Sequence, residues 1–376
     1  MNKIGCGVFH SRFVFLRMLY IHSYQELPVP QNAYEQKAID FCKKWLSGKQ
    51  AFTLHTSGST GIPKSIDLTR EQMMASAELT GKTFGLSQGD TALVCVNIDY
   101  IAGVMMLVRG MTLGLKLVIV PPAGNPFVKY PETLNVDYDF VALVPLQIQQ
   151  IIEDGGVGLQ KLNAMKAVIV GGAAVNLALQ DQIKQLKVPT FATYGMTETV
   201  SHIAIKKLNG IPQNTDEFEV LSGVEIKTDQ RSCLAIKAAA SNHEWIFTND
   251  VVELTEGKKF KIVGRYDNII NSGGVKIQLE EVEKQLLAIP YAESDSWILS
   301  KRFFAWGIPD NNLGQKLVVF VENKEVLPET KELFLKKIQE NLPKYKSPKE
   351  IYFVNEFLET PTGKIDKRAV ASHFGC

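Results

Sequence analysis

Thr56-Ser-Gly-Ser-Thr-Gly-Ile-Pro-Lys64 gathers four hydroxyl side chains, two glycines and one lysine within nine residues. The glycines allow backbone conformations closed to other residues and bring N–H groups close to an anion, and the hydroxyls add further donors. These features predict a loop that binds the phosphates of a nucleotide. The loop residues with this predicted role are Thr56, Ser57, Gly58, Ser59, Thr60, Gly61 and Lys64.

The loop is not a Walker A motif. Lys64 and Ser65 fit the end of the pattern G-x-x-x-x-G-K-[ST], but Pro63 stands where the second glycine belongs. Because proline fixes φ and has no N–H, the backbone cannot cradle phosphate as a P-loop does. A plain polar turn between two strands is the alternative that the loop alone leaves open.

The flanking residues predict a strand, the loop, a second strand and a helix. Ala51–His55 resembles a strand end, and Ser65–Leu68 resembles a short strand. Thr69 followed by Gln72 three residues later forms a capping box, which predicts a helix around Met73–Thr80.

Composition points to an ordinary globular protein. The 376 residues are 45% apolar, enough for about two or three folding units with a sizeable core. The net charge is +1, with 16 basic and 16 acidic residues from Arg265 onward and 25 and 24 before it. No region is basic enough to predict binding to nucleic acid or to an anionic membrane.

Five scattered cysteines form no C-x-x-C pair and have no neighbouring histidine pair, which argues against a disulfide framework and a zinc site. His10, Arg12 and Arg17 interrupt the apolar N-terminal run. We therefore expect no signal peptide and no membrane span, and we expect a cytoplasmic location.

Short apolar runs alternate with helical stretches between residues 91 and 193, which predicts a parallel sheet covered by helices. The predicted strands are Thr91–Val96, Leu115–Val120, Phe140–Val144, Met165–Val170 and Pro189–Ala192. Ligands bind beyond the carboxyl ends of such strands. Two loops are placed there, Gly171-Gly172-Ala173 and Thr193-Tyr-Gly-Met-Thr-Glu198.

The pattern changes after residue 217 to short alternating runs, which predict a small antiparallel sheet or barrel. A helix over Leu279–Ala288, a strand over Lys316–Glu322 and an amphipathic helix carrying Leu335, Ile338 and Leu342 are predicted to follow. This last part is large enough to form a separate domain.

Four separated segments give the chain its resemblance to the adenylate-forming superfamily of acyl- and aryl-CoA ligases, luciferases and peptide-synthetase adenylation domains. They stand in the family's order and are the loop 56–64, Tyr194-Gly-Met-Thr-Glu-Thr199, Thr248-Asn-Asp250 with Gly264-Arg-Tyr-Asp267 and Gly273-Gly274, and Pro361-Thr-Gly-Lys364. The resemblance implies an α/β fold with a large N-terminal domain of parallel and mixed sheets, a small β-barrel-like part and a small mobile α+β C-terminal domain. The implied domains are residues 1–265 and 266–376, with a hinge near Asp267.

The resemblance also implies a reaction in two halves. A carboxylate attacks the α-phosphorus of ATP to give an acyl-adenylate and pyrophosphate, and the thiol of CoA then displaces AMP. The implied partners are a small carboxylic acid, ATP, Mg²⁺ and CoA, without nucleic acid or membrane insertion, and a homodimer is left open.

Each motif has an implied role. Glu198 would hold Mg²⁺, because a hard cation prefers carboxylate and phosphate oxygens. Thr197 would donate near the α-phosphate, and Lys364 would bridge the attacking carboxylate, the ribose and the α-phosphate. Residues implied to hold nucleotide or CoA, besides the loop 56–64, are Gly171, Gly172, Ala173, Tyr194, Gly195, Asp250, Arg265, Gly273 and Gly274.

The chain departs from the family pattern in three residues and in size. Asn249, Asn268 and Asn271 stand where glycine, aspartate and lysine are usual, and only 55 residues precede the loop, which implies a missing or minimal first subdomain. The resemblance is strongest to the o-succinylbenzoate:CoA ligases of menaquinone biosynthesis, among which compact members are typical and which the segments 265–274 and 196–201 resemble more than they resemble fatty-acyl ligases. An aromatic-sized acid pocket would include Ile101, Gly103, Val104, Met105, Ser201 and His202, although a lone histidine and a Met pair are as often core residues.

Another aryl- or acyl-CoA ligase is an open alternative, and two functions of other classes stay open as well. One is an adenylation enzyme that loads a carrier protein and consumes no free CoA. The other is a non-catalytic binding protein of the same fold, which the joint presence of Lys64, Glu198, Asp250 and Lys364 argues against.

Overall fold

The computed structural model describes residues 18–55, 65–210, 216–289, 302–324, 328–360 and 365–374. The described residues form two compact units. The first holds those up to residue 49, with 80–98 and 102–190, and the second holds 50–79, 99–101 and those from residue 191 onward. The domain boundary predicted between residues 265 and 266 stays a prediction.

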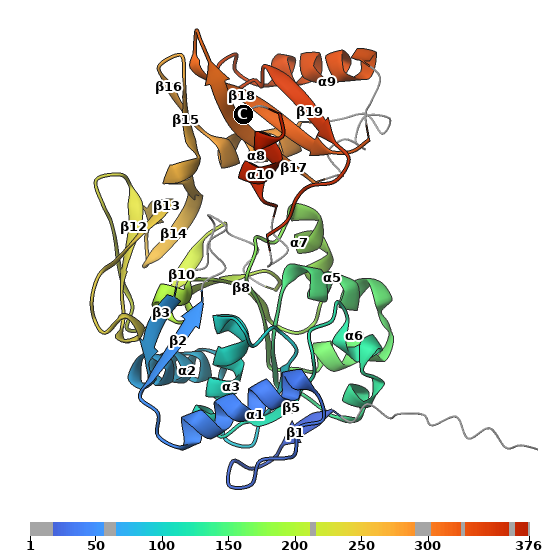
Figure 1. The fold of residues 1–376 in the computed structure, drawn as a ribbon, viewed down its shortest axis with the longest axis vertical. Coiled ribbons are helices and arrows are strands. Elements are labelled where there is room, and N and C mark those ends of the chain that lie inside the picture. The colour runs from blue at the N-terminus through green and yellow to red at the C-terminus, as the bar shows by residue number, and fades with distance from the viewer. Residues whose placement is uncertain are drawn as a thin grey trace, which may run out of the picture. The chain divides into compact units, whose positions relative to one another are not determined.

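A buried parallel sheet forms the centre of the first unit (Figure 1). Its strands run β5 (Lys116–Ile119), β4 (Thr91–Val94), β6 (Phe140–Leu143) and β7 (Ala167–Val170), and β1 (Leu19–Ile21) pairs antiparallel with β5. The apolar runs predicted these four parallel strands at nearly the observed positions, because strands covered on both faces are apolar throughout. The helices are α1 (Ala33–Leu46), α3 (Ile101–Leu113), α4 (Pro126–Lys129), α5 (Pro145–Asp154), α6 (Gly156–Asn163) and α7 (Leu177–Ile183).

A hairpin brackets the predicted phosphate loop. Strands β2 (Ala51–His55) and β3 (Ser65–Thr69) pair antiparallel, and α2 (Arg70–Phe84) follows. The predicted capping box is confirmed, since the Thr69 N–H donates to Gln72 Oε1 at 2.8 Å and the Gln72 N–H donates to Thr69 Oγ1 at 3.2 Å.

An antiparallel sheet forms the first part of the second unit, and the alternating runs after residue 217 predicted most of it. Its strand order is β8 (Thr190–Gly195), β9 (His202–Lys207), β10 (Phe218–Val220), β14 (Lys259–Arg265), β13 (Ile246–Thr255), β12 (Cys233–Lys237) and β11 (Glu225–Thr228). The strand predicted at residues 189–192 as part of the parallel sheet also belongs here and pairs antiparallel with residues 202–207. Tyr194, Ile203, Val252 and Phe260 belong to one buried cluster on this sheet. The core therefore fixes the end of β8, where a predicted site motif begins.

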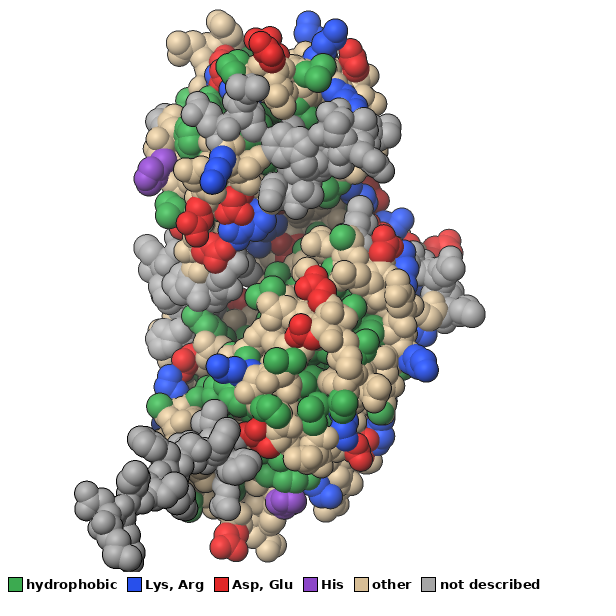
Figure 2. All heavy atoms as spheres, turned by 90° about the vertical axis from the view of Figure 1, so that its right-hand side faces the viewer, with side chains coloured by type: hydrophobic (Ala, Val, Ile, Leu, Met, Phe, Trp, Pro, Cys, Tyr) green, Lys and Arg blue, Asp and Glu red, His purple; other side chains and the backbone are tan. Residues whose placement is uncertain are grey.

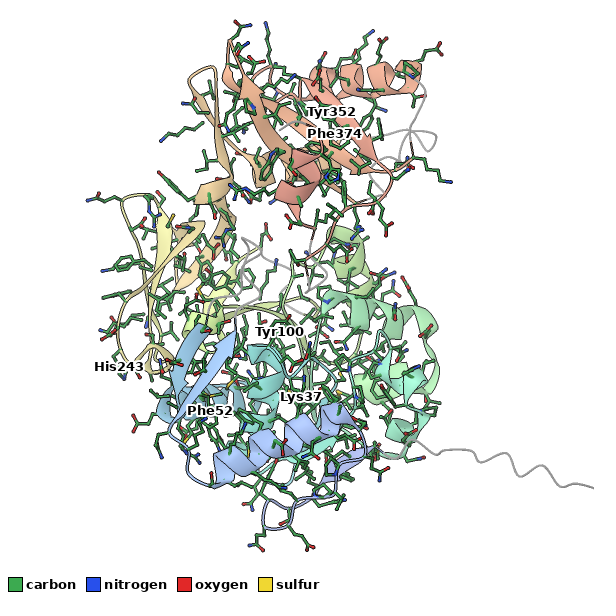
Figure 3. All side chains as sticks on the ribbon, viewed as in Figure 1. Lys37, Phe52, Tyr100, His243, Tyr352 and Phe374 are labelled. Atoms are coloured by element: carbon green, nitrogen blue, oxygen red, sulfur yellow. The ribbon has the colours of Figure 1, made fainter. Side chains whose placement is uncertain are left out.

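The remaining residues build an α+β sandwich. Strands β16 (Val275–Gln278), β15 (Ile269–Ser272), β18 (Gly314–Glu322) and β17 (Phe303–Asp310) lie in that order, with β19 (Glu350–Val354) parallel to β18. Helices α8 (Leu279–Ala288) and α9 (Pro328–Asn341) pack on one face, and α10 (Lys367–Ser372) packs on the other. Tyr352 and Phe374, labelled in Figure 3, lie with ring centroids 5.3 Å apart.

Surface and core agree with the composition. On the face drawn in Figure 2, basic and acidic side chains are interspersed. Three described cysteines, Cys42, Cys95 and Cys233, are buried free thiols. Within the described ranges, no helix is both long enough and apolar enough to cross a bilayer.

Candidate active site

Two predicted parts of the site lie outside the described residues. They are the loop with Thr56, Ser57, Gly58, Ser59, Thr60, Gly61 and Lys64, and the turn 361–364 with Lys364. The residues on either side of the loop are described, and His55 pairs with Ser65 at the ends of β2 and β3.

The segment after β8 exposes two predicted catalytic residues and buries the next two. Thr197 and Glu198 open the 3-10 helix η2 (Thr197–Thr199); Glu198 is exposed and Thr197 is half-buried. Thr199 is buried, and its hydroxyl contacts the Met196 N–H at 3.0 Å and the Ser201 carbonyl at 2.8 Å. These hydrogen bonds connect the backbone of Met196 and Ser201 through the buried Thr199 side chain, while Glu198 stays exposed.

Val200 closes this loop in a strained conformation. Its φ of 63° and ψ of −52°, with a Ser201 N–H to Thr199 carbonyl bond of 2.7 Å, define a γ-turn that is rare and costs about 1–3 kcal/mol for a β-branched residue. Gly195 is needed beside it, because a Cβ there would lie 2.2 Å from the Ser201 carbonyl oxygen.

Glu198 lines an open cavity of about 410 Å³ in the second unit. The start of α2 is fixed at this cavity, since Gln72 Nε2 donates to the Ala240 carbonyl at 3.0 Å. Glu198 therefore lines the same cavity as Ser65, the first described residue after the predicted phosphate loop. Its lining residues are Ser65, Ile66, Asp67, Leu68, Gln72, Glu198, Ser241, Asn242, Glu244, Trp245 and Ile246.

These residues fit a magnesium ion that is held mainly by substrate. No group of three or more His, Cys, Asp or Glu side chains in the described part of the chain could hold a metal by itself. Mg²⁺ usually takes one or two carboxylates and fills its other positions with phosphate oxygens and water. An exposed Glu198 on an open cavity suits that arrangement.

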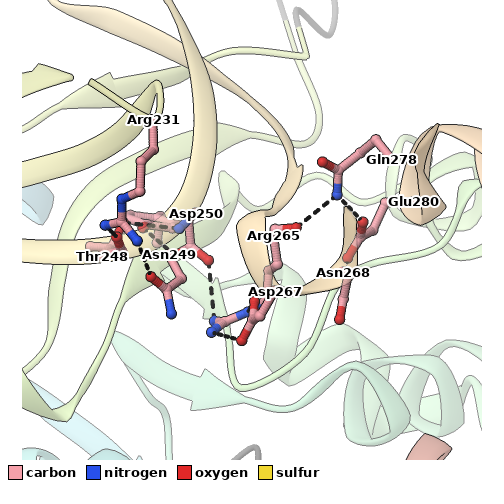
Figure 4. A network of polar contacts seen from close by, with 10 residues as sticks. Arg231, Thr248, Asn249, Asp250, Arg265, Asp267, Asn268, Gln278 and Glu280 are labelled. Atoms are coloured by element: carbon pink, nitrogen blue, oxygen red, sulfur yellow. Dashed lines mark hydrogen bonds and ion pairs between the residues drawn. The ribbon is translucent and has the colours of Figure 1, made fainter. Parts of the chain in front are cut away.

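A polar network connects four predicted residues, three of which, Asp250, Arg265 and Asp267, are labelled in Figure 4. The Tyr194 hydroxyl donates to Asp250 Oδ2 at 2.6 Å, and Arg265 Nη1 donates to Asp250 Oδ1 at 3.2 Å. Arg265 also donates to both oxygens of Asp267, at 2.9 and 3.1 Å. Asp250 on β13 pairs directly with Arg265 on β14, so strand register brings the two side chains together.

The network sets the charge state of its members. Burial, and then the nearby Asp250 carboxylate, raise the pKa of Tyr194, so its hydroxyl stays a donor. Hydrogen bonding to Asp267 raises the pKa of Arg265. Partial burial opposes ionisation of Asp267, but the hydrogen bonds and charge of Arg265 outweigh it and lower the pKa of that carboxyl.

Tyr194 packs more tightly than the sequence suggests. Its ring lies edge-on to Phe260 at 5.2 Å and 5.9 Å from Phe218, with 8% of the residue exposed. The predicted stacking of this ring on adenine stays a prediction.

The other predicted glycines have separate places. Gly171, Gly172 and Ala173 follow β7 in the first unit, and Gly172 has a φ of +82°. Gly273 and Gly274 form the turn between β15 and β16, with φ of +59° and +82°, the left-handed geometry that a two-residue hairpin turn favours.

The candidate acid-pocket residues are mostly core residues. Val104 and Met105 on α3 are buried, and Gly103 packs so closely that a Cβ would lie 2.4 Å from the Asn97 carbonyl oxygen. His202 is buried, with its Nδ1 3.3 Å from the Ser201 hydroxyl. Ile101 is half-buried at the first position of α3.

Two residues near the site were missed by sequence reasoning. Trp245 lines the cavity, and Arg231 hydrogen-bonds the residues beside Asp250. Trp245 could have been noticed as an aromatic residue within the alternating run predicted over residues 244–248. Arg231 belongs to an unremarkable polar turn, and no spacing pattern signals its contact.

Comparison with known families defines the class of this protein. The protein-family model for AMP-binding enzymes matches residues 20–226, and the family model for the C-terminal domain of AMP-binding enzymes matches residues 302–364. The chain belongs to the AMP-binding enzyme family. The predicted superfamily, its α/β fold and its class as an AMP-forming acid–thiol ligase are confirmed.

Two relatives of this chain are named as CoA ligases. A 2-succinylbenzoate–CoA ligase from Oceanobacillus iheyensis is 25% identical, with 94% of this chain and 75% of the relative aligned. A probable CoA ligase from Humulus lupulus is also 25% identical, over 92% of this chain and 70% of the relative.

Solved structures give two further matches. An AMP-forming acyl-CoA synthetase/AMP-acid ligase II-like protein from Dyadobacter fermentans is 44% identical, covers 93% of this chain and 97% of its own, and has a TM-score of 0.62. The o-succinylbenzoate CoA synthetase from Bacillus subtilis, in complex with ATP and magnesium, is 20% identical. The match covers 85% of this chain and 69% of the Bacillus chain, with a TM-score of 0.68. Since the Dyadobacter protein matches almost end to end and the succinylbenzoate ligases are longer, small size does not assign the chain to their branch.

Proposed function

We propose that this protein is an o-succinylbenzoate:CoA ligase, which joins a succinyl-substituted benzoate to CoA through an acyl-adenylate. The 2-succinylbenzoate–CoA ligases among its relatives support the choice of acid. The observation that carries the reaction class is the cavity lined by both the exposed Glu198 and Ser65, the residue that follows the predicted phosphate loop in the sequence.

In the first half-reaction, a carboxylate oxygen bonds to the α-phosphorus of ATP and the bond to pyrophosphate breaks. Asp250 accepts hydrogen bonds from the ribose hydroxyls, and Arg265 holds that carboxylate. Gly171, Gly172 and Ala173 leave room for adenine, and Tyr194 and Gly195 bind the nucleotide. The loop residues with Lys64 bind the outer phosphates, and Thr197 and Lys364 donate to the reacting region. Glu198 would hold Mg²⁺, which would neutralise charge on the phosphates.

In the second half-reaction, the CoA sulfur bonds to the acyl carbonyl carbon, the bond to AMP breaks, and the thiol proton is lost. We propose that residues 266–376 rotate about Asp267 between the halves, moving Lys364 out and Gly273 and Gly274 in. Missing side chains at these glycines leave a path for the pantetheine arm. We expect the reaction to take place in the cytoplasm, where ATP and CoA are available.

A panel of acids tests the substrate. Purified protein is given ATP, Mg²⁺ and one of o-succinylbenzoate, benzoate or a medium-chain fatty acid, with and without CoA, and thioester formation is measured. The proposal predicts a CoA thioester with o-succinylbenzoate and weak turnover of the others. Preference for another acid would keep the mechanism and reject the branch, and adenylate formation without CoA consumption would favour carrier loading.

A further inference from the structure

Arg231 is fixed in place by its own turn. It lies between β11 and β12, where Asp229 accepts the N–H groups of Arg231 and Cys233 at 2.8 and 2.9 Å. The same carboxylate accepts from Arg231 Nε at 2.9 Å. Arg231 Nη2 also lies 2.8 Å from Asp229 Oδ2. Because Asp229 holds both the backbone and the side chain, it sets the direction in which the two terminal nitrogens of the guanidinium point.

Those two nitrogens reach the residues just before Asp250 (Figure 4). Arg231 Nη1 donates to Asn249 Oδ1 at 2.9 Å, and Nη2 donates to the Thr248 carbonyl at 3.1 Å. The Thr248 hydroxyl in turn accepts the Asp250 N–H at 3.0 Å. A glycine at position 249, which the family usually has, offers no side-chain oxygen to this guanidinium.

The strand needs this support because it is irregular here. Cys233 pairs with Val251 and Ala235 pairs with Phe247, so residues 248–250 bulge out of the β12–β13 ladder. A bulge leaves backbone groups without ladder partners. Arg231 supplies the donor for the Thr248 carbonyl. Its guanidinium carbon also lies 5.1 Å from the ring centroid of Tyr266, which follows Arg265 in the sequence.

We propose that Arg231 is a positioning residue that holds the bulge 248–250 and thereby orients the Asp250 carboxylate toward the ribose hydroxyls of ATP. The inference rests on the proposed role of Asp250 in nucleotide binding. Arg231 touches no substrate itself.

Calorimetric titration with Mg·ATP and Mg·2′-deoxy-ATP tests this role, because it needs no acid substrate. The folded wild-type protein is expected to bind ATP about 10-fold more tightly than 2′-deoxy-ATP, a difference of about one hydrogen bond to a charged group. Arg231→Ala is expected to weaken ATP binding about 10-fold and to reduce the preference to about 2-fold or less. A merely structural role would not change the preference between two nucleotides.

Three variants sharpen the test. Arg231→Lys should restore little, because an ammonium cannot make both terminal contacts. Asn249→Gly should reduce the preference partly and add nothing to Arg231→Ala, because the two residues act through one contact. Lys227→Ala removes the same charge from β11, where Lys227 lies over the Trp245 ring, and should keep the wild-type preference.

The outcomes are separable. An Arg231→Ala or, if that variant does not fold, an Asn249→Gly protein with the full wild-type preference would overturn the inference. So would a wild-type protein that binds both nucleotides equally. The proposed function fails on a different result, the absence of acid-dependent pyrophosphate release, which this titration does not use.

Discussion

The carboxylate of Asp250 accepts one hydrogen bond on each oxygen, from the Tyr194 hydroxyl and from the Arg265 guanidinium. Each donor comes from a different strand, and both are held by neighbours: Tyr194 by Phe218 and Phe260, and Arg265 by Asp267. A carboxylate oriented in this way loses little freedom when it binds a diol.

Tyr194→Phe should weaken nucleotide binding while keeping the ring packed. The variant removes a buried 2.6 Å hydrogen bond to a charged acceptor, so we expect a loss of about 1–3 kcal/mol in stability and an ATP Kd raised about 5- to 10-fold. Thermal unfolding and nucleotide titration measure the two effects. An unchanged Kd would mean that the hydroxyl does not orient Asp250 for the nucleotide.

Lys364→Ala should lower the rate of acyl-adenylate formation about 10²- to 10³-fold, because it removes a donor to charge that develops in the transition state. ATP binding should change by only a few-fold. Pre-steady-state formation of acyl-AMP and equilibrium nucleotide binding separate the two. A variant that forms acyl-AMP at nearly the normal rate would remove Lys364 from the mechanism.

At the scale of elements, close backbone packing explains why certain glycines are required. Gly195→Ala should displace the loop 196–201 and lower the free energy of unfolding by about 1–3 kcal/mol, because the new Cβ meets the backbone of Ser201 and His202. Adenylation should fall as well, since Thr197 and Glu198 belong to this loop.

Gly81→Ala is the matched control. Its Cβ would meet only the end of the Leu113 side chain, at 2.8 Å, which can move, and alanine favours the α2 helix by up to about 1 kcal/mol. Denaturant titration of the two variants should therefore give clearly different losses. Equal losses in the free energy of unfolding would show that the backbone contact at Gly195 costs no more than the side-chain contact at Gly81.

Much of the fold could be predicted from the sequence. Buried parallel strands such as Phe140–Leu143 leave continuous apolar runs, and the capping box at Thr69 and Gln72 marks the start of α2. The Arg231 contacts could not be predicted, because they join residues 17 and 18 positions apart across a bulge. The pairing of Asp250 with Arg265 likewise depends on strand register, which motif spacing does not specify.

At the scale of the whole molecule, ion pairs connect the proposed C-terminal domain to the preceding sheet. Asp216 lies 3.2 Å from Lys206 on β9 and 3.0 Å from Lys284 on α8. Lys284 follows the proposed hinge at Asp267, and Lys206 and Asp216 precede it. A large rotation about that hinge would break the pair with Lys284 and leave the pair with Lys206.

The Asp216 pairs should contribute stability that depends on pH. Partial burial opposes ionisation, but the Lys284 hydrogen bond and the charge of Lys206 outweigh it and lower the pKa of Asp216 below its ordinary 3.8. With a lowered folded-state pKa, the contribution is complete above the unfolded value of 3.8 and is lost as the pH falls from there through the folded-state pKa. Asp216→Asn should cost less than about 1 kcal/mol at pH 7.

Urea unfolding at low salt, at pH 7 and near pH 3, measures this contribution. The difference between wild type and Asp216→Asn should shrink toward zero at the lower pH. A difference that stays constant or grows on acidification would contradict the assignment of these pairs.

Whether this chain activates a carboxylate as its adenylate can be measured in a single-turnover experiment without CoA. Enzyme in excess over Mg·ATP is mixed with o-succinylbenzoate and quenched, and the nucleotide products are separated. We expect acyl-AMP and pyrophosphate in equal amounts, formed only with the acid present. Formation of ADP and phosphate, or acid-independent consumption of ATP, would contradict this expectation.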